Sequence, residues 1–341
     1  MNPLETRELG KTGIQVPAMG LGGTSHGGMF GLLEDKQAAV ATVEHAYNKG
    51  ARYFDLAPMY GYGQAETLFG QFLKTVPRDS FVLSTKVGDM FEAGEKDPDN
   101  KHVEIWITEE KMHSYSDFSR DGVLRCFEGS LQRLGIDRVD ILFIHDPDVQ
   151  DRYQEVMDEG FPTLAQLRDQ GVVRAIGVGM NSVDMMIHFA NNADFDCFLV
   201  AGRYTLLDQA ALGQLLPICE SKQIGVIIGG AYNSGILATG TKEGALYDYV
   251  PARPPILEKV RRIEAVCRAH QVPLQAAALQ FPFGHPTVAS NIPGTRSKAR
   301  FDQNFDMMSF PIPADFWAEL KHEGLLGEDV PTPGPALTDS Q

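Results

Sequence analysis

The chain has 341 residues, a formal net charge of −15 and 43% hydrophobic residues, which is enough apolar material for a large core. An acidic surface repels phosphate backbones, so we expect no nucleic-acid partner and interpret the charge as a source of solubility. The four cysteines are scattered without a C-x-x-C pair, which is typical of buried thiols in a reducing compartment. No apolar stretch approaches the roughly 18 residues of a membrane span, and the polar start is unlike a signal peptide. We therefore expect a cytoplasmic protein without a membrane partner.

Short apolar runs alternate with longer amphipathic runs along the chain. A hairpin is predicted first, where residues 4–9 and 14–17 flank a Gly-Lys-Thr-Gly turn. Buried strands are then predicted at residues 18–21, 53–56, 81–85, 139–144, 175–178, 197–200, 225–228 and 288–292. The clearest helical patterns lie between them, at residues 35–49, 121–134, 162–170 and 181–191.

Strands that alternate with helices are typical of parallel βαβ units, which build either a doubly wound sheet or a closed barrel. The eight strands and the preceding hairpin, which can close the bottom of a barrel, favour an α/β fold of the (β/α)8 TIM-barrel type. We expect one domain over residues 1–327, followed by a flexible tail over 328–341 that is rich in Pro and Gly. Long loops are predicted after strands three and seven, at residues 87–120 and 231–255, and loops of this length are usually functional.

Polar side chains stand where the second, third and fourth predicted strands end. Asp55 lies near the end of strand two with Tyr60 just beyond it, Lys86 ends strand three, and His145 ends strand four. The C-terminal ends of barrel strands meet at one face, so we expect these four side chains to converge. A strand-end Asp, a loop Tyr and a core His each have structural explanations as well. A lysine between apolar neighbours requires a paired or functional explanation.

The four side chains together predict proton transfer. A neutral phenol has a pKa of about 10 and is a poor base, and a nearby ammonium lowers that pKa. We therefore predict that Lys86, held by Asp55, lowers the pKa of Tyr60, which then exchanges a proton with a substrate oxygen. His145 is predicted to orient the same oxygen, and a nicotinamide over the reacting carbon completes a hydride transfer.

These residues lie in segments that resemble the aldo-keto reductase family. The matching segments are Tyr-Phe-Asp-Leu-Ala-Pro-Met-Tyr-Gly at 53–61, Ser-Thr-Lys at 84–86, Ile-His at 144–145, Ala-Ile-Gly-Val at 175–178 and Ile-Pro-Gly-Thr at 292–295. The resemblance covers about residues 7–304, most of the chain. It implies that Asp55, Tyr60, Lys86 and His145 are catalytic, and that the cofactor is NAD or NADP.

A narrower resemblance is to the branch of the family that oxidises aldoses at C1. It rests on Gly-Val-Gly-Met-Asn at 177–181 and Ala-Gly-Arg-Tyr-Thr-Leu-Leu at 201–207. It implies that a sugar of the L-fucose, D-arabinose or L-galactose type is oxidised at its anomeric hydroxyl to the lactone, with Tyr60 as the base. The alternatives are a carbonyl reductase, a pyridoxal-type dehydrogenase and a non-catalytic nicotinamide-binding sensor. The intact set of four residues argues against the sensor.

The resemblance also implies a cofactor site across the barrel mouth. The residues assigned to it are Met180, Asn181, Gly230, Thr295, Arg296, Arg300 and Asn304. Asn181 matches the residue that binds the carboxamide, and Arg300 and Asn304 match residues that hold the adenosine half. The helix start near Thr295 offers backbone N–H groups to a phosphate.

Three departures from the family pattern involve four residues. Ala201 stands where relatives often have a Gln that bonds the carboxamide. Gly229 and Gly230 replace a Tyr-Ser pair whose Tyr stacks on the nicotinamide, and Gly294 replaces a Lys that helps to bind the 2′-phosphate of NADP. The loss of that charge weakens a preference for NADP. The sequence therefore predicts NAD or NADP without a choice between them.

The loop at 87–120 contains Phe91, Trp106 and Tyr115, which we interpret either as a lid that binds the substrate or as a hydrophobic cluster under the loop. The His-Asp-Pro-Asp segment at 145–148 is a poor ligand set for a metal. We therefore expect no metal, which disfavours a metal-dependent barrel hydrolase. The expected partner is a small-molecule sugar, and the sequence leaves a homodimer open.

Overall fold

The computed structural model describes residues 1–29, 31–95 and 105–334, and its centre is a barrel of parallel strands. The strands, in their order around the sheet, are β3 (Leu21–Gly22), β4 (Tyr53–Asp55), β5 (Val82–Val87), β8 (Ile141–His145), β9 (Ala175–Met180), β10 (Cys197–Ala201), β11 (Gly225–Gly229) and β14 (Val288–Asn291). Parallel bridges between Met19 and Asn291 and between Gly22 and Gly294 close the sheet. The predicted (β/α)8 fold is confirmed, and each predicted strand overlaps a strand of this barrel.

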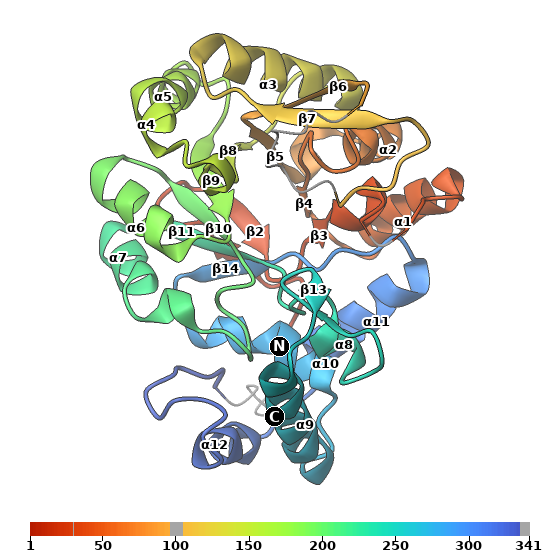
Figure 1. The fold of residues 1–341 in the computed structure, drawn as a ribbon, viewed down its shortest axis with the longest axis vertical. Helices are drawn as coiled ribbons and strands as arrows, with labels where there is room; N and C mark the ends of the chain where they lie inside the picture. Colours follow the sequence, from red (N-terminus) through yellow and green to blue (C-terminus); the bar gives the residue numbers. More distant parts are fainter. Residues whose placement is uncertain (30, 96–104, 335–341) are drawn as a thin grey trace.

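Helices cover the outside of the barrel (Figure 1). The longer ones are α1 (Lys36–Asn48), α2 (Gln64–Leu73), α3 (Arg120–Leu134), α5 (Phe161–Asp169), α6 (Val183–Asn192), α7 (Leu215–Lys222), α9 (Pro254–Ala269), α10 (Leu274–Gln280), α11 (Lys298–Ser309) and α12 (Ala314–His322). Short helical turns are η1 (Thr24–Gly27), η2 (Arg78–Ser80), η3 (Pro147–Gln150), α4 (Tyr153–Glu155), η4 (Val156–Gly160), η5 (Ala210–Leu212) and η6 (Phe281–Gly284). Asp35, Ser119 and Ser182 cap α1, α3 and α6, because each side chain accepts a bond from a first-turn N–H.

The barrel wall separates two layers of core. Along β8, Ile141 and Phe143 belong to the cluster inside the barrel, and Leu142 and Ile144 belong to the cluster between the barrel and its helices. Successive side chains of a strand face opposite sides, and here both sides are buried. This explains why residues 141–144 form a continuous apolar run rather than an alternating one.

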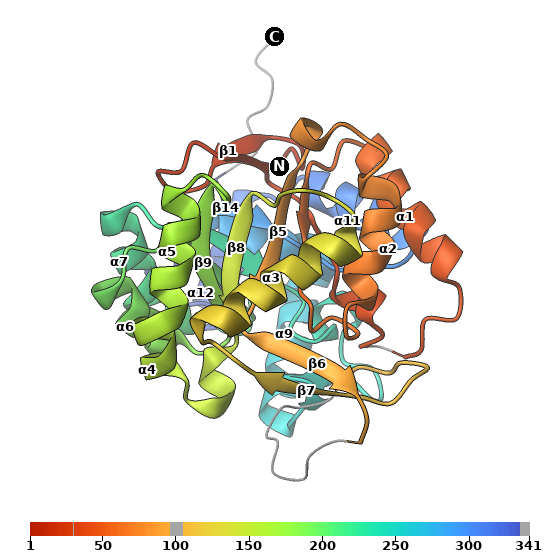
Figure 2. The ribbon, with the colours of Figure 1, turned by 90° about the horizontal axis from the view of Figure 1, so that it is seen from above.

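An N-terminal hairpin closes one end of the barrel. β1 (Thr6–Glu8) pairs with β2 (Gln15–Pro17), as the sequence predicted. Leu9, Ile14 and Val16 of this hairpin are fully buried in the inner cluster. Figure 2 shows the hairpin at one end of the barrel, and the segment that follows β5 at the opposite end. The catalytic face is therefore the end that the hairpin leaves open.

The two predicted long loops contain small elements of their own. The first holds an antiparallel ribbon of β6 (Asp89–Ala93) and β7 (Met112–Ser116), with residues 96–104 outside the described residues. The second holds α8 (Ile236–Thr239) and a hairpin of β12 (Leu246–Tyr247) and β13 (Val250–Pro251).

The segment after α12 returns to the barrel. Leu325, Leu326 and Val330 are buried in the main core cluster. The domain boundary at 327 stays a prediction, and residues 335–341 of the expected tail lie outside the described residues. All four cysteines are buried and free. No helix within the described ranges is long and apolar enough to cross a membrane.

Candidate active site

Three neighbouring strands bring the predicted catalytic residues to one rim of the barrel. Asp55 is the last residue of β4, Lys86 is the penultimate residue of β5, and His145 is the last residue of β8. Tyr60 lies in the turn between β4 and α2. Because β4, β5 and β8 are adjacent and parallel, their C-terminal ends meet at the open end of the barrel.

Lys86 and Asp55 form a buried ion pair at the base of the site. Lys86 Nζ donates to Asp55 Oδ2 at 2.8 Å and to the Leu56 carbonyl at 2.6 Å. The other carboxylate oxygen, Asp55 Oδ1, accepts from Ser84 Oγ at 2.6 Å. Lys86 and Asp55 are each 1% exposed. Buried charges persist when they are paired and hydrogen-bonded, and both conditions hold here.

Tyr60 lies between this ion pair and two aromatic rings. Lys86 Nζ is 4.7 Å from the Tyr60 ring centroid, and the ring centroids of His145 and Trp106 are 5.8 and 5.4 Å away. Burial raises the pKa of Tyr60 well above its usual range, and the charge of Asp55 adds to this. This direction is opposite to the lowered pKa that the sequence predicted. Burial therefore favours the protonated phenol of Tyr60.

His145 lies between two carboxylates. Its Nδ1 is 2.6 Å from Asp89 Oδ2, and its Nε2 is 3.6 Å from Asp146 Oδ2. Burial lowers the pKa of His145, but the charges of Asp146 and Asp89 together raise it above its usual value. Partial burial in turn raises the pKa of Asp146 to about 6. The imidazole therefore has one nitrogen held by a hydrogen bond and one facing a weaker, longer contact.

Asp89 was missed by the sequence analysis, which placed it in the polar loop after strand three. It is the first residue of β6 and is 2% exposed. Gly88 makes this position possible: its φ is +106°, and a Cβ there would lie 1.8 Å from the Phe118 ring. The sequence did contain a signal for this position. Gly88 and Asp89 directly follow the buried strand that ends in Lys86-Val87, and a glycine there allows a sharp turn.

The three aromatic residues of the first long loop do not act together. Only Trp106 contacts Tyr60. Phe91 packs instead against Tyr62 and under Arg133, and Tyr115 is 38% exposed. Phe91 pairs with Ser114 across the ribbon, and Met90 pairs with Tyr115. Since neighbouring strand residues face opposite sides, Phe91 and Tyr115 lie on opposite faces of the ribbon, which removes the predicted three-residue lid.

The predicted nicotinamide end of the cofactor site lies at the ends of β9, β10 and β11. Met180 ends β9 and is buried, and Asn181 follows it and donates from Nδ2 to the Ala201 carbonyl at 3.2 Å. Gly230 follows β11 with a φ of +63°. Ala201 and Gly229 are paired residues of β10 and β11, so these two departures from the family pattern lie side by side on adjacent strands.

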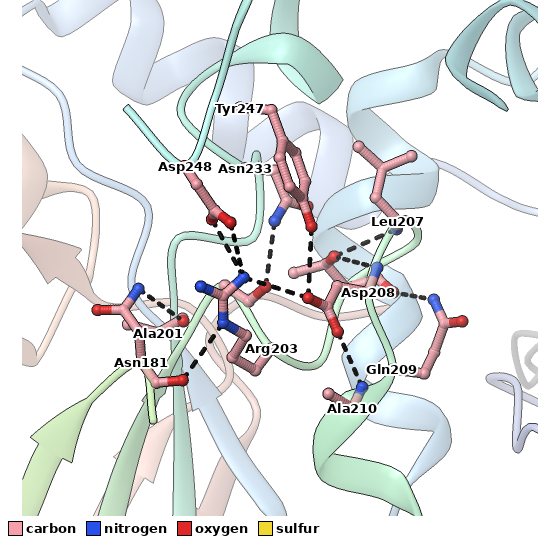
Figure 3. A network of polar contacts seen from close by, with 12 residues as sticks. Asn181, Ala201, Arg203, Leu207, Asp208, Gln209, Ala210, Asn233, Tyr247 and Asp248 are labelled. Atoms are coloured by element: carbon pink, nitrogen blue, oxygen red, sulfur yellow. Dashed lines mark hydrogen bonds and ion pairs between the residues drawn. The ribbon is translucent and has the colours of Figure 1, made fainter. Parts of the chain in front are cut away.

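Arg203 ties this region to the β12–β13 hairpin (Figure 3). Its Nε donates to the backbone oxygen of Asn181 at 3.3 Å, and its NH1 contacts Asp208 at 3.2 Å and Asp248 at 3.0 Å. Asp208 also accepts from the Tyr247 hydroxyl at 3.3 Å. The sequence analysis did not assign these charges. They hold the second insertion beside the residue predicted to bind the carboxamide.

The predicted adenosine end lies at the start of α11. Thr295 is buried, and Arg296 NH1 donates to the Gly31 carbonyl at 2.9 Å. Arg300 is exposed on the first turn of α11, and Asn304 Oδ1 accepts from the Tyr232 hydroxyl at 2.8 Å. The side chain of Ser297, the N-cap residue of α11, makes no capping hydrogen bond, so the first-turn N–H groups lie beside two arginines without that partner.

This donor set fits the phosphates of a dinucleotide, because uncapped helix N–H groups and guanidinium groups both bind phosphate oxygens. Gly294 has no side chain that could cover these donors. A Cβ at Gly294 would lie 2.8 Å from Thr24 Oγ1, so a larger residue there would require Thr24 to move. Among the described residues, no group of three or more His, Cys, Asp or Glu side chains is placed to hold a metal ion.

A profile of the Aldo/keto reductase family matches residues 18–323, nearly the whole barrel. The chain belongs to the aldo/keto reductase family. This aldo/keto reductase is 38% identical to D-threo-aldose 1-dehydrogenase from Pseudomonas sp, over 94% of this chain and 97% of that protein. It is 37% identical to pyridoxal 4-dehydrogenase from Microbacterium luteolum, over 94% of this chain and 98% of that protein.

A solved structure of an aldo-keto reductase from Bacillus halodurans, in its holo form, has the same fold. The TM-score is 0.74 at 22% identity, and the match covers 96% of this chain and 98% of that one. Family membership makes the protein an oxidoreductase, and it agrees with the convergence of Asp55, Tyr60, Lys86 and His145 at one rim.

Proposed function

We propose that this aldo/keto reductase is an NAD(P)-dependent dehydrogenase that oxidises the anomeric hydroxyl of an aldose to the lactone. The observation that carries the proposal is the convergence of Tyr60, the Lys86–Asp55 pair and His145 beside Trp106. It is supported by 38% identity with D-threo-aldose 1-dehydrogenase across almost the full chain. An apolar ring such as that of Trp106 suits the flat, C–H-bearing face of a sugar.

The bound nicotinamide supplies the acceptor for the hydride of the sugar's C1. The chain's own residues bind it through the rim at Asn181 and Gly230 and through the donors at the start of α11, around Thr295, Arg296 and Arg300. Asn304 and Tyr232 form one side of the adenosine end. The residues named at the nicotinamide end and at the adenosine end do not distinguish NAD from NADP, so the proposal includes both cofactors.

Tyr60 exchanges the proton of the reacting oxygen. Oxidation requires the unprotonated form of the base, and burial favours the protonated phenol by raising its pKa. We therefore expect the rate of oxidation to increase with pH into the alkaline range. Lys86 and Trp106 keep the Tyr60 ring in place, Lys86 through its contact with the ring face and Trp106 through ring packing.

Carbonyl reduction is the second candidate. A neutral Tyr60 with a raised pKa is suited to protonate a carbonyl oxygen. The relative named pyridoxal 4-dehydrogenase is nearly as similar as the aldose enzyme, so an aldehyde or hemiacetal of the pyridoxal type belongs to the same test.

A substrate panel separates these functions. Purified protein is mixed with NAD or NADP and with L-fucose, D-arabinose, L-galactose or pyridoxal, and formation of reduced cofactor is followed by absorbance. The reverse assay uses NADH or NADPH with an aromatic aldehyde. Turnover of an aldose supports the proposal. Turnover of aldehydes alone contradicts it, and cofactor binding without any turnover supports a non-catalytic sensor.

Tyr60→Phe tests the assignment of the proton-transfer residue. We expect kcat to fall by roughly 10²- to 10⁴-fold, the usual contribution of a positioned acid or base. Cofactor binding, measured by quenching of tryptophan fluorescence, should be retained. Tyr62→Phe is the matched control, because Tyr62 lies two residues further along the same turn and packs on Phe91. Turnover that survives in Tyr60→Phe would show that another group carries the proton.

A further inference from the structure

We propose that Asp89 is a positioning residue that fixes the ring hydrogen of His145 on Nδ1 and so turns Nε2 towards the substrate oxygen. The effect on turnover rests on the proposed oxidation of a hydroxyl. The position of the hydrogen does not, and it can be measured without any substrate.

The geometry of the Asp89–His145 pair determines where the ring hydrogen lies. Asp89 Oδ2 and His145 Nδ1 are 2.6 Å apart, and the two residues are 2% and 7% exposed. A carboxylate can only accept hydrogen bonds, so the hydrogen in this contact belongs to Nδ1. In the neutral imidazole the other nitrogen then carries a lone pair and no hydrogen.

The backbone holds Asp89 in this position. The left-handed conformation of Gly88 turns the chain at the end of β5, and the Asp89 carbonyl accepts a hydrogen bond from Cys126 Sγ at 3.3 Å. Asp89 is therefore held in place by the end of β5 and by a contact with α3. Carboxylates that hold a functional imidazole commonly set its tautomer in this way.

The second nitrogen remains available for the substrate. Asp146 Oδ2 is 3.6 Å from Nε2, longer than a hydrogen bond. The charged and titratable groups that face His145 are Lys86, Asp89, Asp146, Asp148 and Tyr60. Among the contacts described for these five residues, none places a hydrogen-bond donor on Nε2.

The Asp89 contact fixes which edge of the His145 ring faces the substrate. Burial lowers the pKa of His145, but the charges of Asp146 and Asp89 raise it above its usual value, which favours the imidazolium, and in that form Nε2 donates to the substrate oxygen. Tyr60 takes the single hydrogen of the reacting hydroxyl in the proposed oxidation, so Asp89 acts by holding the ring in place.

The experiment measures the tautomer directly. Protein labelled with ¹⁵N-histidine is titrated by NMR, and His145→Gln identifies the His145 signals. We expect the neutral ring to carry its hydrogen on Nδ1. In Asp89→Asn we expect a shift towards the form with hydrogen on Nε2. Asp146→Asn is the matched control, because it removes the same charge from the other side of the ring and should leave the tautomer unchanged.

Two results would overturn the proposal: hydrogen on Nε2 in the unmodified protein, or an equal tautomer shift in both variants. The first needs no variant, so the proposal can be tested even if Asp89→Asn does not fold.

Turnover gives a separate measurement. We expect Asp89→Asn to lower kcat/KM for the sugar roughly tenfold or more, the effect of losing one oriented hydrogen bond. Glu92→Gln, a charge-matched change on the exposed part of β6, should leave it unchanged. Normal sugar oxidation by Asp89→Asn with an altered tautomer would contradict the role in turnover. Failure of the unmodified protein to oxidise any sugar would contradict the proposed function and leave the tautomer result standing.

Discussion

Lys86 and Asp55 are each 1% exposed, and their side chains contact each other at 2.8 Å. Breaking a buried ion pair by removing one partner typically costs about 3–5 kcal/mol, because the other charge is left uncompensated. Replacing both partners removes that penalty. The pair therefore has two separable roles, one in the stability of the barrel rim and one beside the Tyr60 ring.

A double-mutant cycle separates these roles. We expect Lys86→Met to lower the free energy of unfolding by about 3–5 kcal/mol, and Asp55→Asn combined with Lys86→Met to lower it by less than the sum of the single changes. Urea denaturation measures all four proteins. Additive effects would mean that the two charges are not coupled in the folded protein.

His26 gives the protein a pH-dependent stability. It is completely buried, and burial lowers its pKa from 6.5 to about 4. Between these pH values the unfolded chain binds a proton that the folded chain does not. The contribution of His26 to the free energy of unfolding is therefore fully present above about pH 6.5. It is lost as the pH falls towards 4, by up to about 1.4 kcal/mol per pH unit.

His26→Gln removes this titrating group. We expect its free energy of unfolding to fall less than that of the unmodified protein between neutral pH and about pH 5. Urea denaturation at both pH values measures the difference, and His322→Gln, an exposed position at the end of α12, is the control. Equal pH dependence in His26→Gln would show that other groups determine the acid sensitivity.

At the scale of the element, the turn from β5 into β6 depends on one glycine. Gly88 has a φ of +106°, and a Cβ there would overlap the Phe118 ring. We expect Gly88→Ala to lower the free energy of unfolding by more than about 3 kcal/mol, since the change combines strain with a clash in the core. Gly171→Ala also has a positive φ but no atom within 4 Å, so it should lose only about 1–2 kcal/mol. Thermal melting of both variants compares the two costs.

The elements that sequence predicted well are those with a strong local signal. Residues 141–144 are apolar over their whole length, and α3 lies between a capping Ser119 and Gly135. The β6–β7 ribbon has no such signal, because it mixes polar and apolar residues without regular alternation and its pairing joins residues 89–93 to 112–116. The polar contacts of a ribbon are fixed by tertiary structure, not by a local pattern.

The candidate site divides in the same way. Asp55, Lys86 and His145 stand at or next to strand ends and Tyr60 lies in the turn after β4, so strand prediction placed them on one rim. The direction of the pKa shift of Tyr60 could not be predicted, because it depends chiefly on how deeply the fold buries the phenol. The pairing of His145 with Asp89 spans 56 residues and depends on the direction of one turn.

At the scale of the whole molecule, the two ends of the barrel have different tasks. The N-terminal hairpin closes one end, and the β6–β7 ribbon lies at the other (Figure 2). Ile14 of the hairpin is buried in the cluster inside the barrel. We expect the packing at the closed end to contribute to the free energy of unfolding. We expect the chemistry at the open end to depend little on that packing.

Ile14→Ala tests this division. We expect a loss of about 2–5 kcal/mol in the free energy of unfolding, typical of a large buried side chain cut to Ala. In the folded fraction, kcat for the substrate found in the panel should not change. A large fall in kcat at a temperature where the variant is folded would show that the closed end is coupled to the rim.

The closed end also has a consequence for how the chain reaches its folded state. Arg7 NH1 donates to the Val288 carbonyl, and Ser290 Oγ donates to the Pro17 carbonyl, so the first hairpin meets β14 across separations of 281 and 273 residues. Contacts this distant form slowly, because a long loop must close before they contribute. Until β14 arrives, β3 and β11 are open sheet edges that can pair with other chains. During synthesis, the last barrel strand therefore decides when the growing chain stops being prone to aggregation.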